Sequence, residues 1–126
     1  MYNEELILDG LRNIEEALLH VLDRASWISG VDDLLTSPSG VDVLDIVTIR
    51  LMAVGEEIKK IDKRSEGKLL SQYPETQWKN IMGFRDVIAH AYFHIDAAVV
   101  FDTLRNNVRP LLATIQQIIA DIENAK

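Results

Sequence analysis

The amino-acid sequence predicts an all-α fold, an up-and-down four-helix bundle with a short extra helical turn, formed by one domain over residues 1–126. Three long segments repeat apolar residues at alternating steps of three and four, which places those residues on one face of an α-helix. Few segments show the alternation of apolar and polar residues that is typical of strands. The repeats could also support a coiled coil, but the loops are short enough for the helices to pack on one another.

The first helix is predicted from about Asn3 to Ser26. Glu4 and Glu5 suit its N-terminus, where the helix dipole favours negative charge. Gly30 favours a stop, and a loop with turn-forming residues follows it. The apolar stripe of this helix consists of Leu11, Ile14, Leu18, Val21, Ala25 and Ile28.

The second helix is predicted from Val41 to Asp62. Gly55 lies inside it, where glycine costs about 1 kcal/mol relative to alanine, so we expect another helix to approach closely at this position. Glu56 follows on the flank of the apolar stripe and is either a solvated side chain or a partner for Arg85 further along the chain. The stripe consists of Leu44, Val47, Leu51, Val54, Ile58 and Ile61.

The segment 63–76 is polar and is expected to contain at most a helical turn, at Leu69-Leu70. Pro74 limits how far that segment can continue, and the third helix is predicted from Glu75 to Ala91.

The fourth helix is predicted from Asp96 to about Asn124. Pro110 interrupts it, because proline lacks a backbone donor and frees the carbonyl of Asn106, so we expect a kink there. Its apolar stripe consists of Phe101, Leu104, Val108, Leu111, Ile115, Ile118 and Ile122.

Side chains able to do chemistry gather in one stretch, Gly83 to Asp96, which contains the pattern R-x4-H-x-Y as Arg85, His90 and Tyr92. On a straight helix with about 100° between residues, Arg85 falls in the middle of the apolar face. Arg85 is therefore expected to point into a core or an interface, where a guanidinium must be paired or must reach solvent along its stem. The same face carries Trp78, Ile81, Met82, Phe84 and Ile88.

Arg85 and His90 lie roughly 140° apart on a straight helix, so one helix cannot direct both at one small ligand. Two arrangements remain open. Either the helix ends before His90 and the chain turns between Ala91 and Ile95, or a second subunit completes the site. Asp96 favours the turn, because it can cap the next helix.

The composition limits the classes of protein to which the chain can belong. Its net charge is −7 with a pI near 4.8, so it lacks the basic field of a general nucleic-acid binder, and any RNA contact must be local. The absence of cysteine excludes disulfides and thiolate metal sites, and it fits a reducing cytoplasm. The acidic N-terminus and the lack of a long apolar run predict neither a signal peptide nor a membrane span.

Four blocks of sequence, in this order, resemble the HepT-like proteins of the HEPN superfamily. They are LMAVGEE at residues 51–57, YPETQW at 73–78, the Arg-His-Tyr motif, and the tail YFHID at 92–96. The resemblance covers nearly the whole chain. Two positions depart from the family pattern: Asp86 stands where Asn is common, and His94 stands where Gly is frequent. Neither removes the Arg-His-Tyr set.

The resemblance implies a metal-independent endoribonuclease, acting as the toxin of a HepT/MntA-type toxin–antitoxin pair. It also implies a homodimer, RNA as the substrate and a cognate MntA-like nucleotidyltransferase as the antitoxin. Arg85 and His90 would be catalytic, and Tyr92 would be the residue to which the antitoxin attaches AMP. The alternative is a non-catalytic helical module that binds or regulates a nucleotidyltransferase, which the acidic balance favours.

The chemistry of the motif agrees with RNA cleavage. RNA carries its own nucleophile, the 2′-hydroxyl, so His90 as base or acid and Arg85 as an electrostatic clamp would suffice. Asp86, one turn before His90, could orient the ring, and Glu56 could support Arg85. The alternatives are a surface histidine at a helix end and, for Tyr92, a half-buried anchor.

Metal and cofactor sites have little support in the sequence. His90 and His94 have the spacing of a helical chelating pair, but the predicted turn separates them, and His20 has no helical register with either. No Gly-rich phosphate-binding loop is present, so no cofactor is expected.

Overall fold

A computed structural model describes residues 3–88 and 96–125, and these residues form helices and no strand. The predicted all-α bundle is therefore confirmed. The helices are α1 (Glu4–Arg24), α2 (Pro38–Arg64), α3 (Trp78–Met82), α4 (Phe84–Ile88), α5 (Ala97–Asn106) and α6 (Val108–Asn124), with two short 3-10 helices, η1 (Val31–Leu34) and η2 (Leu70–Gln72).

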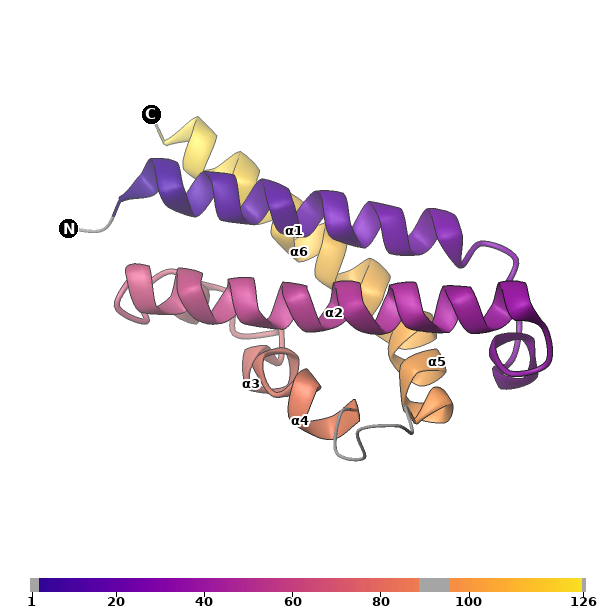
Figure 1. Cartoon of the computed structure of the whole chain (residues 1–126). Coiled ribbons are helices and arrows are strands. Elements are labelled where there is room, and N and C mark those ends of the chain that lie inside the picture. Colours follow the sequence, from indigo (N-terminus) through magenta and orange to yellow (C-terminus); the bar gives the residue numbers. More distant parts are fainter. Residues whose placement is uncertain (1–2, 89–95, 126) are drawn as a thin grey trace.

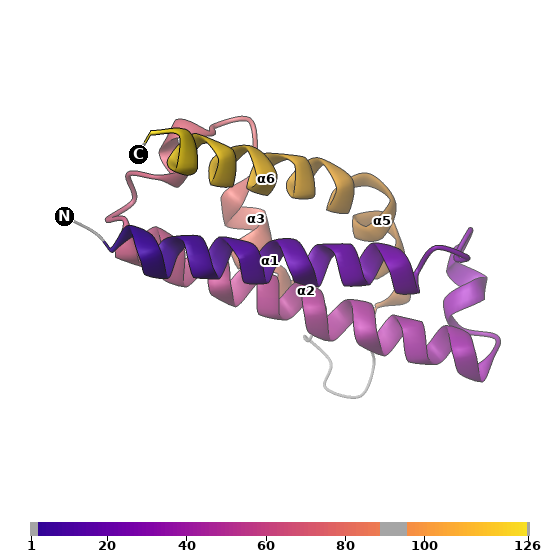
Figure 2. The ribbon, with the colours of Figure 1, turned by 90° about the horizontal axis from the view of Figure 1, so that it is seen from above.

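Helices α1, α2 and α6 form the long part of the bundle (Figure 1). α1 and α2 lie side by side and antiparallel, and α6 crosses behind them to end near the start of α1 (Figures 1 and 2). Arg12 on α1 and Glu123 on α6 form an ion pair of 2.6 Å at that end. The short helices α3, α4 and α5 pack against α2.

The core lies where the predicted stripes meet, because each stripe turns its apolar residues toward the neighbouring helices. Its fully buried large side chains come from α1, η1, α2 and α6. They are Ile7, Leu11, Ile14, Leu18, Val21, Leu34, Val47, Ile58, Ile61, Ile115 and Ile118.

Helix α2 begins about one turn earlier than predicted, at Pro38 instead of Val41. The Ser37 hydroxyl accepts a hydrogen bond from the Gly40 amide at 3.0 Å, and Pro38 occupies the first helical position. Serine as cap and proline next to it start a helix, because the proline nitrogen needs no acceptor there. The residues predicted to form a turn therefore form a helix start.

Gly55 allows the close approach that its place in α2 predicts. A Cβ atom at Gly55 would lie 2.6 Å from the carbonyl oxygen of Ile81 in α3. The backbones of α2 and α3 thus meet at a distance that only glycine permits.

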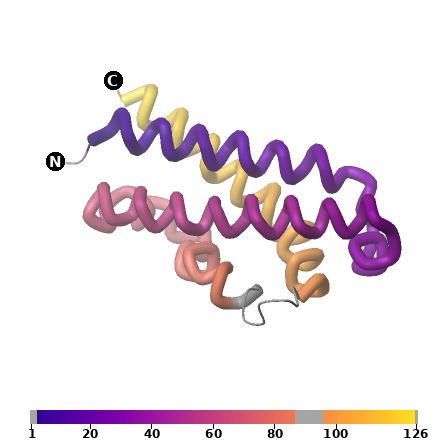
Figure 3. The backbone as a smooth tube through the Cα atoms, viewed as in Figure 1, coloured from indigo at the N-terminus to yellow at the C-terminus, as the bar shows by residue number. Residues whose placement is uncertain are grey.

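The third helix is not continuous, and this part of the prediction is wrong. Instead of one helix from Glu75, α3 begins at Trp78 and ends at Met82, and α4 follows after Gly83. The amide of Gly83 still bonds to the carbonyl of Lys79, but glycine stabilises a helix poorly, and the two short helices differ in direction (Figure 3).

The fourth helix is kinked, as predicted from Pro110. The break lies at Asn107, between α5 and α6, one turn before the proline whose ring opposes the carbonyl of Asn106 (Figure 3). Asp96 caps α5, as predicted: its side chain accepts hydrogen bonds from the amides of Ala98 and Val99 at 3.1 and 3.2 Å.

Candidate functional site

Arg85 is the second residue of α4 and is exposed. Of the two predicted surroundings, a core or an interface, the core is therefore wrong, and the interface stays a prediction. The physical cause is the break at Gly83. The break changes the helical phase, so a position calculated from Trp78 on one straight helix does not hold beyond it. Within residues 3–88 and 96–125, Arg85 forms no ion pair with a carboxylate. Asp86 beside it is also exposed.

Glu56 does not pair with Arg85 in the described part of the chain. It is half-exposed on α2, and its carboxylate lies 3.2 Å from the Nζ atom of Lys59. This is a helical surface pair of the kind that contributes little to stability. The solvated alternative for Glu56 is the one that the structure contains.

His90 and Tyr92 lie outside the described residues, as do His94 and the turn predicted between Ala91 and Ile95. The structure describes the two helices between which this stretch runs. α4 extends to Ile88, and α5 begins at Ala97 (Figure 1). Both helices pack against α2.

Two buried aromatic side chains hold the helices that carry the motif. Trp78, at the start of α3, is 9% exposed, and Phe84, at the start of α4, is 8% exposed. The Trp78 indole N–H donates to the carbonyl of Tyr73 at 3.0 Å. Arg85 therefore follows directly after an anchored residue.

The segment before α3 is attached to α6 by two side-chain hydrogen bonds. The Tyr73 hydroxyl donates to the Asp121 carboxylate at 2.6 Å, and the hydroxyls of Thr76 and Thr114 lie 3.2 Å apart. Burial, then the hydrogen bond to Asp121 and its charge, raise the pKa of Tyr73 to about 12. The same hydrogen bond, with a second from Gln117, lowers the pKa of Asp121. In the sequence, this segment stood out only through its resemblance to the family. Its hydrogen bonds to α6 could not be predicted, because the partner residues are distant in the chain.

A cavity of about 450 Å³ lies between α2, α3, α5 and α6, next to the start of α4. It was not predicted, because it depends on how helices distant in sequence end beside one another. Its lining consists of Leu51, Val54, Glu75, Thr76, Gln77, Asn80, Ile81, Phe84, Val99, Thr103, Asn107, Val108, Pro110 and Leu111.

Within the described ranges, no three side chains of His, Cys, Asp or Glu gather as metal ligands would. His20 lies on α1, and the pair His90 and His94 is outside those ranges. No described helix combines the length and the apolar character that crossing a membrane requires.

The comparisons with known proteins agree with one another. The family model described as "Ribonuclease HepT-like" matches residues 14–118. "Putative RNase MJ0125" of Methanocaldococcus jannaschii is 26% identical over 105 residues, covering 76% of this chain and 87% of that protein. "Putative RNase TTE0752" of Caldanaerobacter subterraneus subsp. tengcongensis is 26% identical over 110 residues, covering 86% and 90%. "Putative RNase MJ1216", also of M. jannaschii, is 33% identical over 73 residues, covering 58% and 57%. No solved structure matches the chain significantly.

Proposed function

Because the chain belongs to the HepT-like ribonuclease family, we propose that it is a metal-independent endoribonuclease in which Arg85 and His90 are the catalytic residues. The observation that carries this proposal is the exposure of Arg85 on a short helix anchored by its buried neighbour Phe84. In a chain with a net charge of −7, a guanidinium without a carboxylate partner in the described ranges is a local site for phosphate.

The reaction follows from the chemistry of RNA. His90 takes the proton of a 2′-hydroxyl, whose oxygen attacks the adjacent phosphorus and displaces the 5′-oxygen of the next nucleotide. That oxygen takes up one proton as the proton held by His90 is released, and the products are a 2′,3′-cyclic phosphate and a free 5′-hydroxyl. Arg85 stabilises the negative charge that develops on the phosphorane, and Asp86 orients the His90 ring.

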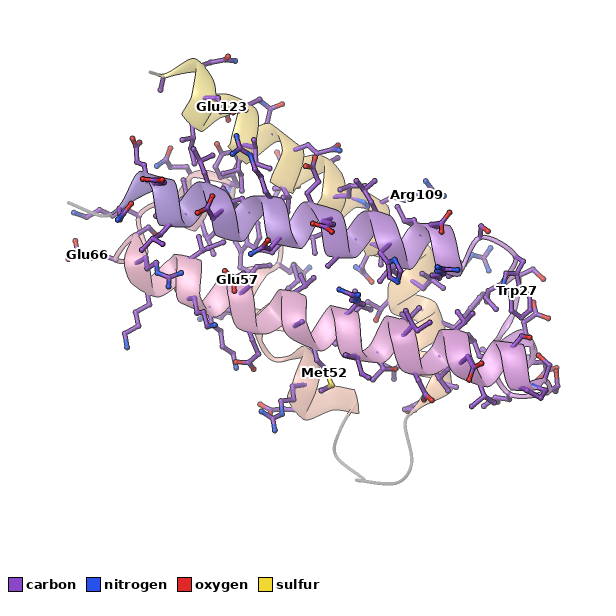
Figure 4. The ribbon with its side chains drawn as sticks, turned by 45° about the horizontal axis from the view of Figure 1, so that its top comes forward. Trp27, Met52, Glu57, Glu66, Arg109 and Glu123 are labelled. Carbon is purple, nitrogen blue, oxygen red and sulfur yellow. The ribbon has the colours of Figure 1, made fainter. Side chains whose placement is uncertain are left out.

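The proposed assembly is a homodimer with the motif at a two-fold cleft. The outer face of α2 supports it, because the apolar residues Ile49, Met52 and Ala53 lie there at steps of three and four. Figure 4 shows Met52 on the side of α2 that adjoins the short helices. Ile49 is 63% exposed, Ala53 is exposed and Met52 is partly buried. Covering this face with a second copy would bring two Arg85 side chains toward one RNA strand.

The proposed biological role is that of a toxin held inactive by a nucleotidyltransferase antitoxin. AMP attached to Tyr92 would add bulk and a negative charge two residues after His90, and the added phosphodiester could pair with Arg85 in place of RNA. Co-expression with the partner enzyme, followed by peptide mapping, tests this role. Increments of about 329 Da on the Tyr92 peptide support it. Complete neutralisation of the Tyr92→Phe variant refutes it.

The cleavage experiment uses the purified chain on total RNA, with and without EDTA. Wild type should cleave in both conditions, and His90→Ala should lose about 10²–10⁴-fold in rate. Circular dichroism of each variant shows that the fold persists. Cleavage that EDTA abolishes, or that His90→Ala retains, contradicts the assignment.

The net charge of −7 favours one alternative, a non-catalytic module that binds a nucleotidyltransferase. It predicts no cleavage by the wild-type chain under any condition, together with a stable complex with the partner enzyme.

A further inference from the structure

The cavity beside α4 lies where two helices are interrupted. Phe84 in its wall follows directly after the break at Gly83, and Asn107, Val108 and Pro110 belong to the break between α5 and α6. The helix changes direction at each break, so the side chains next to the two breaks leave the space between them unfilled. The cavity therefore follows from the same glycine and proline that shape the fold.

The floor of the cavity is apolar. Leu51 and Val54 of α2, Phe84 of α4, and Val108 and Leu111 of α6 are all buried. These side chains cannot satisfy a charged group, and they suit an uncharged body of low polarity.

The rim of the cavity carries amide side chains. Gln77, Asn80 and Asn107 line it and are exposed. Gln77 and Asn107 occupy the N-cap positions of α3 and α6, but their side chains donate or accept no capping hydrogen bond there. The amide nitrogen of Asn80 donates to the amide oxygen of Gln77. Amides offer both donors and acceptors, which is the combination that recognises the edge of a nucleobase.

The charges in the wall argue against a phosphate as the occupant. Among the described lining residues the ionisable side chain is Glu75, an acid, and none is Lys, Arg or His. A phosphate would be repelled there. Three exposed cations adjoin lining residues in the sequence: Lys79 before Asn80, Arg85 after Phe84, and Arg109 between Val108 and Pro110. Of these, Arg85 is the one that belongs to the proposed catalytic pair.

We propose that this cavity binds one unpaired nucleobase of the RNA substrate, while the phosphate attached to that nucleotide faces Arg85. The inference rests on the proposed function and adds specificity to it. Gln77, Asn80 and Asn107 read the edge of the base, and the apolar floor with Phe84 contacts its face. Cleavage sites are then selected by the base, although the cavity takes no part in the chemical step.

The test uses two neighbouring asparagines as a matched pair. Asn107 lines the cavity, whereas Asn106 is exposed, bonds to Asp102 and does not line it. Nucleoside 5′-monophosphates are titrated into wild type, Asn107→Ala and Asn106→Ala, and side-chain amide signals are followed by NMR. A third variant, Thr103→Leu, fills the cavity from α5. We expect about tenfold weaker binding for Asn107→Ala and Thr103→Leu, and no change for Asn106→Ala.

Sequencing of the cleaved RNA ends gives a second reading. Asn107→Ala and Thr103→Leu should raise KM, leave kcat close to wild type and flatten the base preference at the cleavage sites. An unchanged preference in both variants overturns the proposal while the nuclease assignment stands. If wild type cleaves no RNA, the nuclease assignment fails, and NMR still decides on the cavity. Shifts confined to its amides then support base binding, and their absence overturns it.

Discussion

At the scale of single residues, Arg85 is exposed and without an ion-pair partner in the described ranges, so its contribution to folding should be small. We expect Arg85→Ala to change the free energy of unfolding by less than about 0.5 kcal/mol. Loss of the charge that stabilises the transition state should lower the rate of RNA cleavage about 10²–10³-fold. Urea denaturation and single-turnover cleavage measure the two quantities separately.

The control for Arg85 is Arg64, an exposed arginine in the last turn of α2. Arg64→Ala removes the same charge from the protein far from α4 and should retain cleavage. If both variants lose activity equally, Arg85 contributes only to the general charge of the protein.

Gly55 gives the second prediction at this scale. A methyl group there would lie 2.6 Å from the Ile81 carbonyl oxygen, a backbone atom that moves only if α3 moves. We expect Gly55→Ala to lower the free energy of unfolding by about 1–3 kcal/mol, although alanine favours a helix. Gly30→Ala is the matched control, because a methyl group at Gly30 meets nothing within 4 Å. Equal stability of the two variants would contradict the close approach.

At the scale of elements, the hydrogen bond between Tyr73 and Asp121 attaches the segment before α3 to α6, and it should depend on pH. The pKa of Tyr73 is raised to about 12, so its contribution is present below the ordinary tyrosine pKa near 10 and is lost as pH rises toward 12. Wild type should therefore lose more stability than Tyr73→Phe between pH 10 and 12. Thermal unfolding across this range measures the difference.

Asp121 gives the acid side of the same prediction. Its pKa is lowered, so its contribution is present above the ordinary Asp range and is lost as pH falls through the lowered value. In Tyr73→Phe the larger cause of that shift is absent, and the acid-induced loss should shrink. Identical pH profiles for wild type and Tyr73→Phe would show that the bond does not persist in solution.

The two helix breaks explain which elements could be predicted. Pro110 breaks a helix through its own covalent geometry, so the kink followed from one residue. Gly83 only weakens a helix by about 1 kcal/mol, and whether the helix continues depends on packing against α2. The break at Gly83 could not be derived from local sequence, and the core location predicted as one alternative for Arg85 was wrong with it. The N-cap at Asp96 and the close approach at Gly55 were local enough to predict.

At the scale of the whole molecule, the outer face of α2 predicts the oligomeric state. We expect light scattering at micromolar concentration to give twice the chain mass of 14.3 kDa. Ile49→Glu places a charge on this face and should produce the monomer. Leu35→Glu, at an exposed apolar residue after η1, should remain a dimer. A wild-type mass of one chain at all concentrations would refute the proposed cleft.

The candidate site was predicted only in part, because its components depend on different ranges of the chain. Arg85, His90 and Tyr92 could be proposed as the motif residues from sequence, since motif spacing is local, and their roles stay predictions. The cavity is lined by residues of α2, α3, α5 and α6, and no pattern within any one of these helices shows that they share a cavity. For the same reason sequence could suggest Glu56 as a partner for Arg85 but could not test the pairing.

The break at Gly83 also has a consequence for hydrogen exchange. α4 is a helix of five residues whose hydrogen bonds do not continue into α3, whereas α1, α2 and α6 share the buried core. Amide protons of α4 should therefore exchange through a local opening of low free energy, well before those of α2. A bound oligonucleotide that closes over Arg85 should slow exchange in α4 selectively. Exchange rates would then report substrate engagement in the His90→Ala variant, which we expect to form little product.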